Sequence, residues 1–194
     1  MEFITIAFDK TIDRTSFDCS THPALNTYIA QQAGQDEKRN VSRTFMYLED
    51  GMLLGYYTLA NTSVALDELS EEQARKMPRY PMPAAMLSRL AVDQRMQRKG
   101  LGQRLMADFF RRIYTVSKHS GVAFIVVDAK DEQAAKYYRE LCSSPRNTTH
   151  SACCYRLRQS FKACDPKSSL KTNARCTGLA QWLHFHASYK PLIV

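Results

Sequence analysis

A short basic loop with two glycines is the stretch of this sequence whose residue types point most directly to chemistry. It comprises Gln97, Arg98, Lys99, Gly100, Leu101 and Gly102, and a long amphipathic helical pattern begins within it. The first backbone N–H groups of a helix have no partner within the helix and lie at the positive end of its dipole. Glycines lack the Cβ atom that keeps an anion away from the backbone, and the two cationic side chains add charge. The loop is therefore predicted to bind a diphosphate.

Two common phosphate-binding loops do not fit this spacing. The pattern Gly-x-x-x-x-Gly-Lys-Ser/Thr is absent. Only Gly-x-Gly of the dinucleotide fingerprint is present, and no acidic residue ends a following strand at the required distance. The predicted diphosphate site therefore belongs to another class.

The elements that must position this loop follow from the hydrophobic pattern. Asp50-Gly51 is a hairpin signal, and Pro78, Pro81 and Pro83 predict an extended connection. We expect strands at 4–7, 43–48, 52–60, 85–92 and 122–127, and helices at 23–32, 66–75, 101–117 and 131–141. The alternation of strand and helix after residue 84 indicates an α/β fold with a mixed sheet and flanking helices.

The loop resembles a motif of the GNAT acyl-CoA N-acetyltransferases, Gln/Arg-x-x-Gly-x-Gly/Ala, which is matched here by Gln97, Gly100 and Gly102. The resemblance implies the GNAT fold and acetyl-CoA as the acetyl donor. It also implies that backbone N–H groups around Leu90, Ala91 and Val92 receive the thioester carbonyl and the pantetheine. The diphosphate is then expected on Gln97, Arg98, Lys99, Gly100, Leu101 and Gly102, together with Gln103.

A narrower resemblance covers residues 3–141. In order and spacing, several stretches are similar to the GNAT toxins of bacterial type II toxin–antitoxin modules: 17–19, 22–26, 43–45, 55–59, 78–83, 89–93, 126–131 and 134–139. It implies acetylation of the α-amino group of aminoacyl-tRNA, which blocks translation. It further implies neutralisation by a ribbon-helix-helix antitoxin and a homodimeric state.

The same resemblance marks Tyr138 as the general acid that protonates the leaving thiolate. A phenol with a pKa of about 10 is protonated at neutral pH, so it is able to donate. Without the family, a core aromatic on a helix face is the better interpretation of this residue. No side chain is assigned as a base, because the α-amino group of an aminoacyl ester titrates near neutrality.

Charge is distributed unevenly along the chain. The formal net charge is +8, but residues 1–141 contribute only +1 and residues 142–194 contribute +7. Overall basicity therefore does not argue that residues 1–141 bind RNA. Local clusters do, and the candidates for holding a tRNA backbone are Lys38, Arg39, Arg43, Arg79 and Arg89. The alternative is a solvated surface with contacts to the CoA phosphates.

Residues 142–194 differ from the preceding domain at 3–141. They contain five of the six cysteines and one acid, and they lack the strand continuation and final hairpin of a GNAT domain. We hypothesise a frameshift: a permitted codon choice for 141–162 encodes VFIATEHNPLSLLLPIASKL in another frame. Sequencing the gene across codon 141 tests this. A metal site is the rival explanation, but no Cys-x-x-Cys pair exists, so no metal ligand is assigned.

Three functional alternatives remain open at this point. The first is the aminoacyl-tRNA acetyltransferase, the second a small-amine or protein N-acetyltransferase, and the third an inactive chain that binds only antitoxin or RNA. No apolar stretch is long enough to span a membrane, and no secretory signal is visible. We therefore expect a cytoplasmic protein with reduced cysteines.

Overall fold

The computed structural model describes residues 3–20, 22–69, 71–75, 77–128 and 152–156. The described residues fall into two compact units. One contains the residues up to Thr62 together with Ala85–Gly121, and the other contains Ser63–Ala84 together with the residues from Val122 onward. None of the helices in the described ranges has the length and apolarity needed to cross a bilayer.

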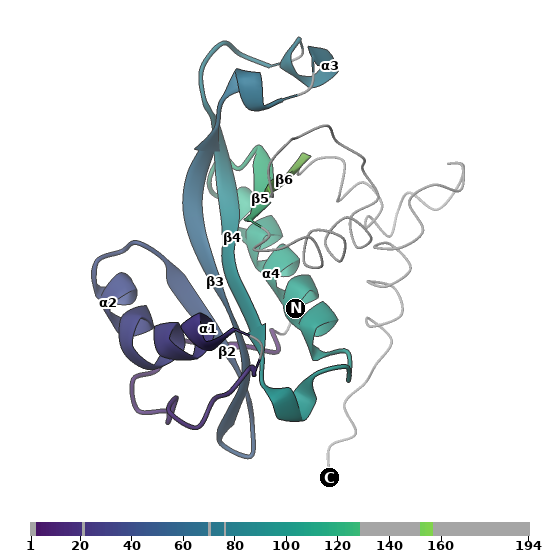
Figure 1. Cartoon of the computed structure of the whole chain (residues 1–194). Helices are drawn as coiled ribbons and strands as arrows, with labels where there is room; N and C mark the ends of the chain where they lie inside the picture. Colours follow the sequence, from purple (N-terminus) through teal and green to yellow (C-terminus); the bar gives the residue numbers. More distant parts are fainter. Residues whose placement is uncertain (1–2, 21, 70, 76, 129–151, 157–194) are drawn as a thin grey trace. The chain divides into compact units, whose positions relative to one another are not determined.

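Six strands form the sheet, in the hydrogen-bonded order β1-β2-β3-β4-β5-β6 (Figure 1). Their bounds are β1 Ile6–Ala7, β2 Arg43–Glu49, β3 Met52–Val64, β4 Met82–Val92, β5 Phe124–Asp128 and β6 Ala152–Arg156. The pairs β1/β2, β2/β3 and β5/β6 are antiparallel. The predicted hairpin is present, because Glu49 pairs with Met52 across a two-residue loop whose residues both have positive φ, Asp50 at 51° and Gly51 at 76°.

The first unit has three helical segments after β1 and one long helix after β4. They are α1 Pro23–Thr27, a π-helical turn η1 Tyr28–Gln32, α2 Ala33–Lys38 and α4 Leu101–Ser117. The helix predicted at 23–32 thus continues through Gly34, where the position of a Cβ would lie 3.4 Å from the Phe8 ring. The helix predicted at 101–117 has the bounds expected from its apolar period.

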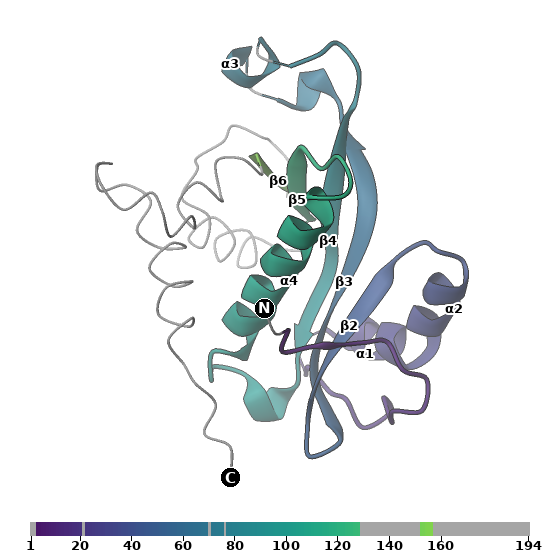
Figure 2. The same ribbon diagram turned by 180° about the vertical axis from the view of Figure 1, so that it is seen from behind.

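Helical layers lie on opposite sides of β3, with α1 and α2 on one side and α4 on the other (Figures 1 and 2). Because the side chains of a strand alternate between its two faces, neighbouring residues of β3 contact different layers. The Tyr56 hydroxyl donates to the Leu25 carbonyl of α1 at 2.8 Å, whereas the adjacent Tyr57 hydroxyl donates to Asp108 of α4 at 2.8 Å. Gly55 also faces α4, since a Cβ there would lie 3.0 Å from Leu105 Cδ1. Glycine at this position lets the first turns of α4 approach the sheet.

A buried carboxylate fastens α4 to the start of the chain. Asp108 is 0% exposed and accepts hydrogen bonds from the Ile4 backbone N–H at 2.8 Å and the Thr5 hydroxyl at 2.6 Å, in addition to Tyr57. Arg112, one turn later on α4, forms an ion pair with it at 3.5 Å. Four donors around one buried carboxylate satisfy the charge, as a stable buried ion requires.

The second unit contains elements that differ from the prediction. The helix expected at 66–75 is replaced by a 3₁₀ turn η2 Leu66–Glu68 and a short helix α3 Glu71–Ala74, because Leu69 is extended at φ −96°, ψ 155°. β4 begins earlier than residue 85 and includes Pro83, whose carbonyl accepts from the Ala123 N–H at 2.9 Å. β6 was not predicted, since its sequence has no apolar alternation, yet it pairs with β5 along five residues.

Candidate active site

A tight turn joins the end of β4 to α4. The Asp93 side chain caps the 3₁₀ turn η3 Gln94–Met96, and two residues then adopt left-handed conformations, Arg98 at φ 60° and Gly100 at φ 82°. The first helical hydrogen bond runs from the Arg104 N–H to the Gly100 carbonyl at 3.2 Å. The backbone N–H groups at 101–103 therefore point out of the helix end without carbonyl acceptors in the same helix.

The residues predicted to bind the diphosphate differ in solvent exposure. Four of them are exposed around the helix end: Arg98, Lys99, Gly100 and Gln103. Gly102 lies in the first turn of α4, while the Leu101 side chain is only 1% exposed and packs toward β3, so this residue offers its backbone alone. A Cβ built at Gly100 meets nothing within 4 Å, which leaves space for an anion beside the first turn. The donor set and the open space fit a diphosphate.

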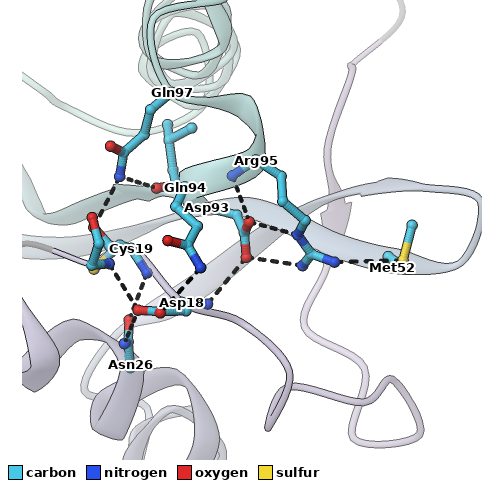
Figure 3. Close-up of polar contacts among 10 residues, drawn as sticks. Asp18, Cys19, Asn26, Met52, Asp93, Gln94, Arg95 and Gln97 are labelled. Carbon is cyan, nitrogen blue, oxygen red and sulfur yellow. Dashed lines mark hydrogen bonds and ion pairs between the residues drawn. The ribbon is translucent and has the colours of Figure 1, made fainter.

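Gln97 is engaged differently from its neighbours. Its side-chain amide donates to the Cys19 carbonyl at 2.9 Å and to the Val92 carbonyl at 3.1 Å (Figure 3). Both acceptors are backbone atoms, one on the N-terminal loop and the other at the end of β4. The side chain thus holds the turn to two other segments.

The last residues of β4 form the floor beside this turn. Ala91 is 4% exposed and belongs to an apolar cluster with Tyr56, whereas Leu90 and Val92 are half-buried. The adjacent Asp93 N–H donates to the Leu54 carbonyl of β3 at 2.9 Å. The backbone that the resemblance assigns to the thioester is therefore held by a packed strand.

Arg89 lies on the side of β4 that faces η1. Its guanidinium carbon is 3.7 Å from the centroid of the Tyr28 ring, a cation–π contact. The Tyr28 hydroxyl donates to Asp36 at 3.1 Å and lies 3.3 Å from the Ser42 hydroxyl. Burial raises the pKa of Tyr28, so the ring stays neutral. Sequence reasoning missed Tyr28, because only the fold places it under Arg89.

The other basic candidates fall into two groups. Lys38 and Arg39 are exposed at the C-terminal end of α2, and Arg43 is next to them because its guanidinium contacts Glu37 at 2.6 Å as well as Asn40. These three cations therefore gather at one place. Arg79 is exposed in the second unit.

Some predicted residues lie outside the described ranges. Tyr138 falls within 129–151, and so does the helix predicted at 131–141. Most of the cysteine-rich segment also lies outside them. In the part of the chain that the structure describes, no three His, Cys, Asp or Glu side chains are grouped for a metal ion.

A polar cluster beside the turn was also missed (Figure 3). Asp93 is 1% exposed, and its carboxylate is held by Arg95 and by the backbone N–H of Asp18. Burial acts to raise the pKa of Asp93, but the hydrogen bonds from Arg95 and Asp18 outweigh it and keep the pKa below the ordinary 3.8. Asp18 and Asp93 lie in two of the stretches that resemble the GNAT toxins, 17–19 and 89–93. That resemblance was the signal by which the cluster could have been found.

Comparison with known proteins identifies the family to which this architecture belongs. Residues 10–142 match the acetyltransferase (GNAT) family. The chain belongs to this family. The resemblance predicted from the motif at 97–102 is thereby confirmed, and so is the α/β acetyltransferase fold.

Several relatives are toxins. A tRNA-acetylating toxin of Mycobacterium tuberculosis is 36% identical over 126 residues, which cover 65% of this chain and 75% of that protein. A probable toxin TacT of Sinorhizobium fredii is 28% identical over 119 residues, and the match spans 60% of this chain and 65% of TacT.

Solved structures give the same result for the fold. A tyrosine-to-phenylalanine mutant of KacT superposes with a TM-score of 0.73 at 26% identity, over 82% of this chain and 97% of KacT. AtaT complexed with acetyl-methionyl-tRNAfMet superposes with a TM-score of 0.76 at 23% identity, over 84% and 100% of the two chains, and this likeness concerns the fold.

Proposed function

We propose that this chain transfers an acetyl group from acetyl-CoA to the α-amino group of aminoacyl-tRNA and so blocks translation. The observation that carries the proposal is the glycine-opened start of α4, with Arg98 and Lys99 exposed beside it, in a GNAT chain 36% identical to a tRNA-acetylating toxin. An anion-binding helix end suits the diphosphate of CoA. The relative indicates the acceptor.

The donor site in this proposal comprises the end of β4 and the following turn. Backbone groups of Leu90, Ala91 and Val92 orient the thioester carbonyl. The diphosphate lies against the backbone N–H groups at 101–103 and the exposed side chains of Arg98, Lys99 and Gln103. The thioester supplies an activated acetyl group that an amine attacks directly, without a covalent enzyme intermediate. What the chain contributes is proximity and a polarised carbonyl.

Proton transfer needs two groups. The α-amino group of the acceptor has a pKa of about 8, so part of it is already neutral and nucleophilic at physiological pH. We assign Tyr138 as the general acid for the leaving thiolate, on the resemblance alone. The Tyr138 hydroxyl donates its proton to the departing sulfur as the C–S bond breaks. Water takes the proton that the attacking nitrogen loses as the C–N bond forms, and the phenolate regains a proton from solvent.

The acceptor side is assigned to the basic residues. Arg89 is held over Tyr28 next to the β4 residues of the donor site, and Lys38, Arg39 and Arg43 gather at the end of α2. Arg79 is a further contact to the tRNA backbone. Cations of this kind bind phosphate irrespective of base sequence, so affinity should fall steeply with salt.

Further parts of the proposal concern organisation and partners. Residues 3–141 form the acetyltransferase domain, and 142–194 are an atypical segment that arose by a frameshift. A ribbon-helix-helix antitoxin neutralises the toxin, which acts as a homodimer in the cytoplasm. KacT and AtaT have been solved with their antitoxins and DNA, which supports an antitoxin partner.

The test is mass spectrometry of the amino acids released from charged tRNAs after incubation with the full chain and acetyl-CoA. With charged tRNA, the wild-type chain should produce N-acetylated amino acids and the Tyr138→Phe variant should not. Thermal melting checks that the variant is folded. Polyamines and uncharged tRNA serve as competing acceptors. Acetylation of polyamines alone contradicts the proposal, and so does a melting temperature that acetyl-CoA leaves unchanged.

A further inference from the structure

A set of hydrogen bonds joins the turn after β4 to the loop before α1. We call it the Asp93 cluster, and its members are Asp18, Asn26, Asp93, Gln94, Arg95 and Gln97 (Figure 3). The Asp18 N–H donates to Asp93 Oδ2 at 3.0 Å, although the two residues are 75 positions apart in the sequence. The cluster therefore ties together parts of the chain that local structure does not connect.

Asp93 is the buried centre of the cluster. Its Oδ1 accepts from the Arg95 backbone N–H at 2.9 Å and from Arg95 Nε at 2.7 Å, and its Oδ2 accepts from Arg95 Nη2 at 2.9 Å. Together with the Asp18 N–H, these donors satisfy the carboxylate fully. A satisfied buried network of this kind specifies one arrangement of its segments.

Asp18 continues the cluster into α1. Its Oδ1 accepts from Asn26 Nδ2 at 2.8 Å, and its backbone carbonyl accepts from the Gln94 N–H at 2.8 Å. Asn26 Oδ1 in turn accepts from the Cys19 N–H at 3.0 Å. The helix that leads into η1, where Tyr28 lies under Arg89, is thus positioned from the same network as the turn.

Gln97 closes the connection on the other side. Its amide has two N–H groups, and they donate to the carbonyls of Cys19 and Val92. No side-chain donor is left for an anion, and the remaining amide oxygen repels one. The next residue, Arg98, is held at φ 60°, a left-handed conformation that residues with a Cβ rarely adopt. A turn that contains such a residue needs fixed anchors.

We propose that Gln97 and Asp18 are positioning residues, which hold the anion-binding turn against the start of α1 and do not contact the nucleotide. The inference rests on the proposed function. In this inference, Gln97, the first residue of the GNAT loop motif, keeps the backbone N–H donors at 101–103 in place. It also links the donor site to the helix on the acceptor side.

The experiment measures the Kd of CoA by calorimetry at a temperature well below melting. Gln97→Met keeps the size of the side chain and removes both donors, so the turn samples other conformations and binding must order it again. The Kd should rise roughly tenfold, the loss expected for two hydrogen bonds of ordinary strength. Gln35→Met, on the exposed face of α2, is the matched control and should leave the Kd unchanged.

A double-mutant cycle separates positioning from direct contact. Asp18→Ala removes the carboxylate that accepts from the Asn26 and Gln94 side chains, which loosens the loop that Gln97 holds through the Cys19 carbonyl, so it should raise the Kd as well. The double variant with Gln97→Met should be clearly less than additive, because both substitutions act on the same placement of the turn. Additive effects indicate that Gln97 contacts the nucleotide directly and overturn the inference. A lower melting temperature with an unchanged Kd overturns it too, since it reveals a role in stability alone.

Two further arms complete the design. If Gln97→Met does not fold, Gln97→Ala replaces it in the cycle, because it also removes the donors to the Cys19 and Val92 carbonyls but places no apolar chain of the same length beside them. Wild-type protein that binds no CoA refutes the proposed function itself. That outcome is distinct from wild-type binding with additive variants.

Discussion

The conformation of Gly100 allows one prediction to be worked out quantitatively. The residue lies at φ 82°, ψ 0°, where a Cβ costs about 1–2 kcal/mol. A Cβ there meets no atom within 4 Å, so the backbone term stands alone and no clash adds to it. Replacing glycine also reduces the entropy of the unfolded chain, which offsets about 0.4–1 kcal/mol. Gly100→Ala should therefore lower the free energy of unfolding by about 1 kcal/mol, or roughly 2–4 °C in Tm.

Gly34→Ala is the matched control. Gly34 lies within α2, and the position of its Cβ is in ordinary contact with Phe8 at 3.4 Å. Here the unfolded-state term and the helix propensity act in the same direction, so the substitution should stabilise by up to about 1 kcal/mol. Gly100→Asn tests the backbone argument further. Asparagine tolerates the left-handed region, so this variant should lose less free energy of unfolding than Gly100→Ala.

Urea denaturation and thermal melting measure these differences, with and without acetyl-CoA. Gly100→Ala should also show a smaller rise in Tm on adding acetyl-CoA, because the strained turn places the backbone donors less well. Equal shifts of the same sign for Gly100→Ala and Gly34→Ala would refute the reasoning, since nothing then distinguishes the left-handed glycine from the helical one.

Three other substitutions probe the framework. Gly55→Ala should destabilise by about 1–3 kcal/mol in urea denaturation, because its Cβ would lie 3.0 Å from Leu105; no loss would mean that α4 shifts freely. Asp108→Asn should cost about 3 kcal/mol by the same assay, since it leaves Arg112 without its buried partner, and a loss comparable with that of Asp9→Asn on the surface would contradict this. The lowered pKa of Asp93 contributes stability that is complete above pH 3.8 and is lost as the pH falls below it. Asp93→Asn should therefore flatten the acid limb of a Tm–pH profile, and an unchanged slope would exclude this carboxylate as its source.

Local sequence signals were sufficient for the parts of the fold that depend on near neighbours. The Asp50-Gly51 hairpin and the bounds of α4 follow from turn chemistry and helical period, and both are present. The signal at Gly100 was also local, since only glycine readily adopts the left-handed turn observed there. The motif at 97–102 was enough to predict the acetyltransferase family.

Other elements were decided by contacts that the sequence pattern does not display. The helix predicted to end at Gln32 continues as η1 and α2, where Gly34 accommodates the Phe8 ring. β6 forms because β5 offers it an edge with free backbone groups, although its own residues show no alternation. Pairing with a distant strand outweighs weak intrinsic preference.

The amino-acid sequence by itself determined the Asp50-Gly51 hairpin, the bounds of α4 and the glycine-opened start of that helix, because each depends on residues within one or two turns of one another. Only the tertiary structure decided that Gln97 donates to the Cys19 carbonyl, that Asp93 is held by Asp18, and that Arg89 lies over Tyr28. These pairs are about 61 to 78 residues apart in the sequence, and a hydrogen bond or ring contact at such separation exists only once the sheet has brought its segments together.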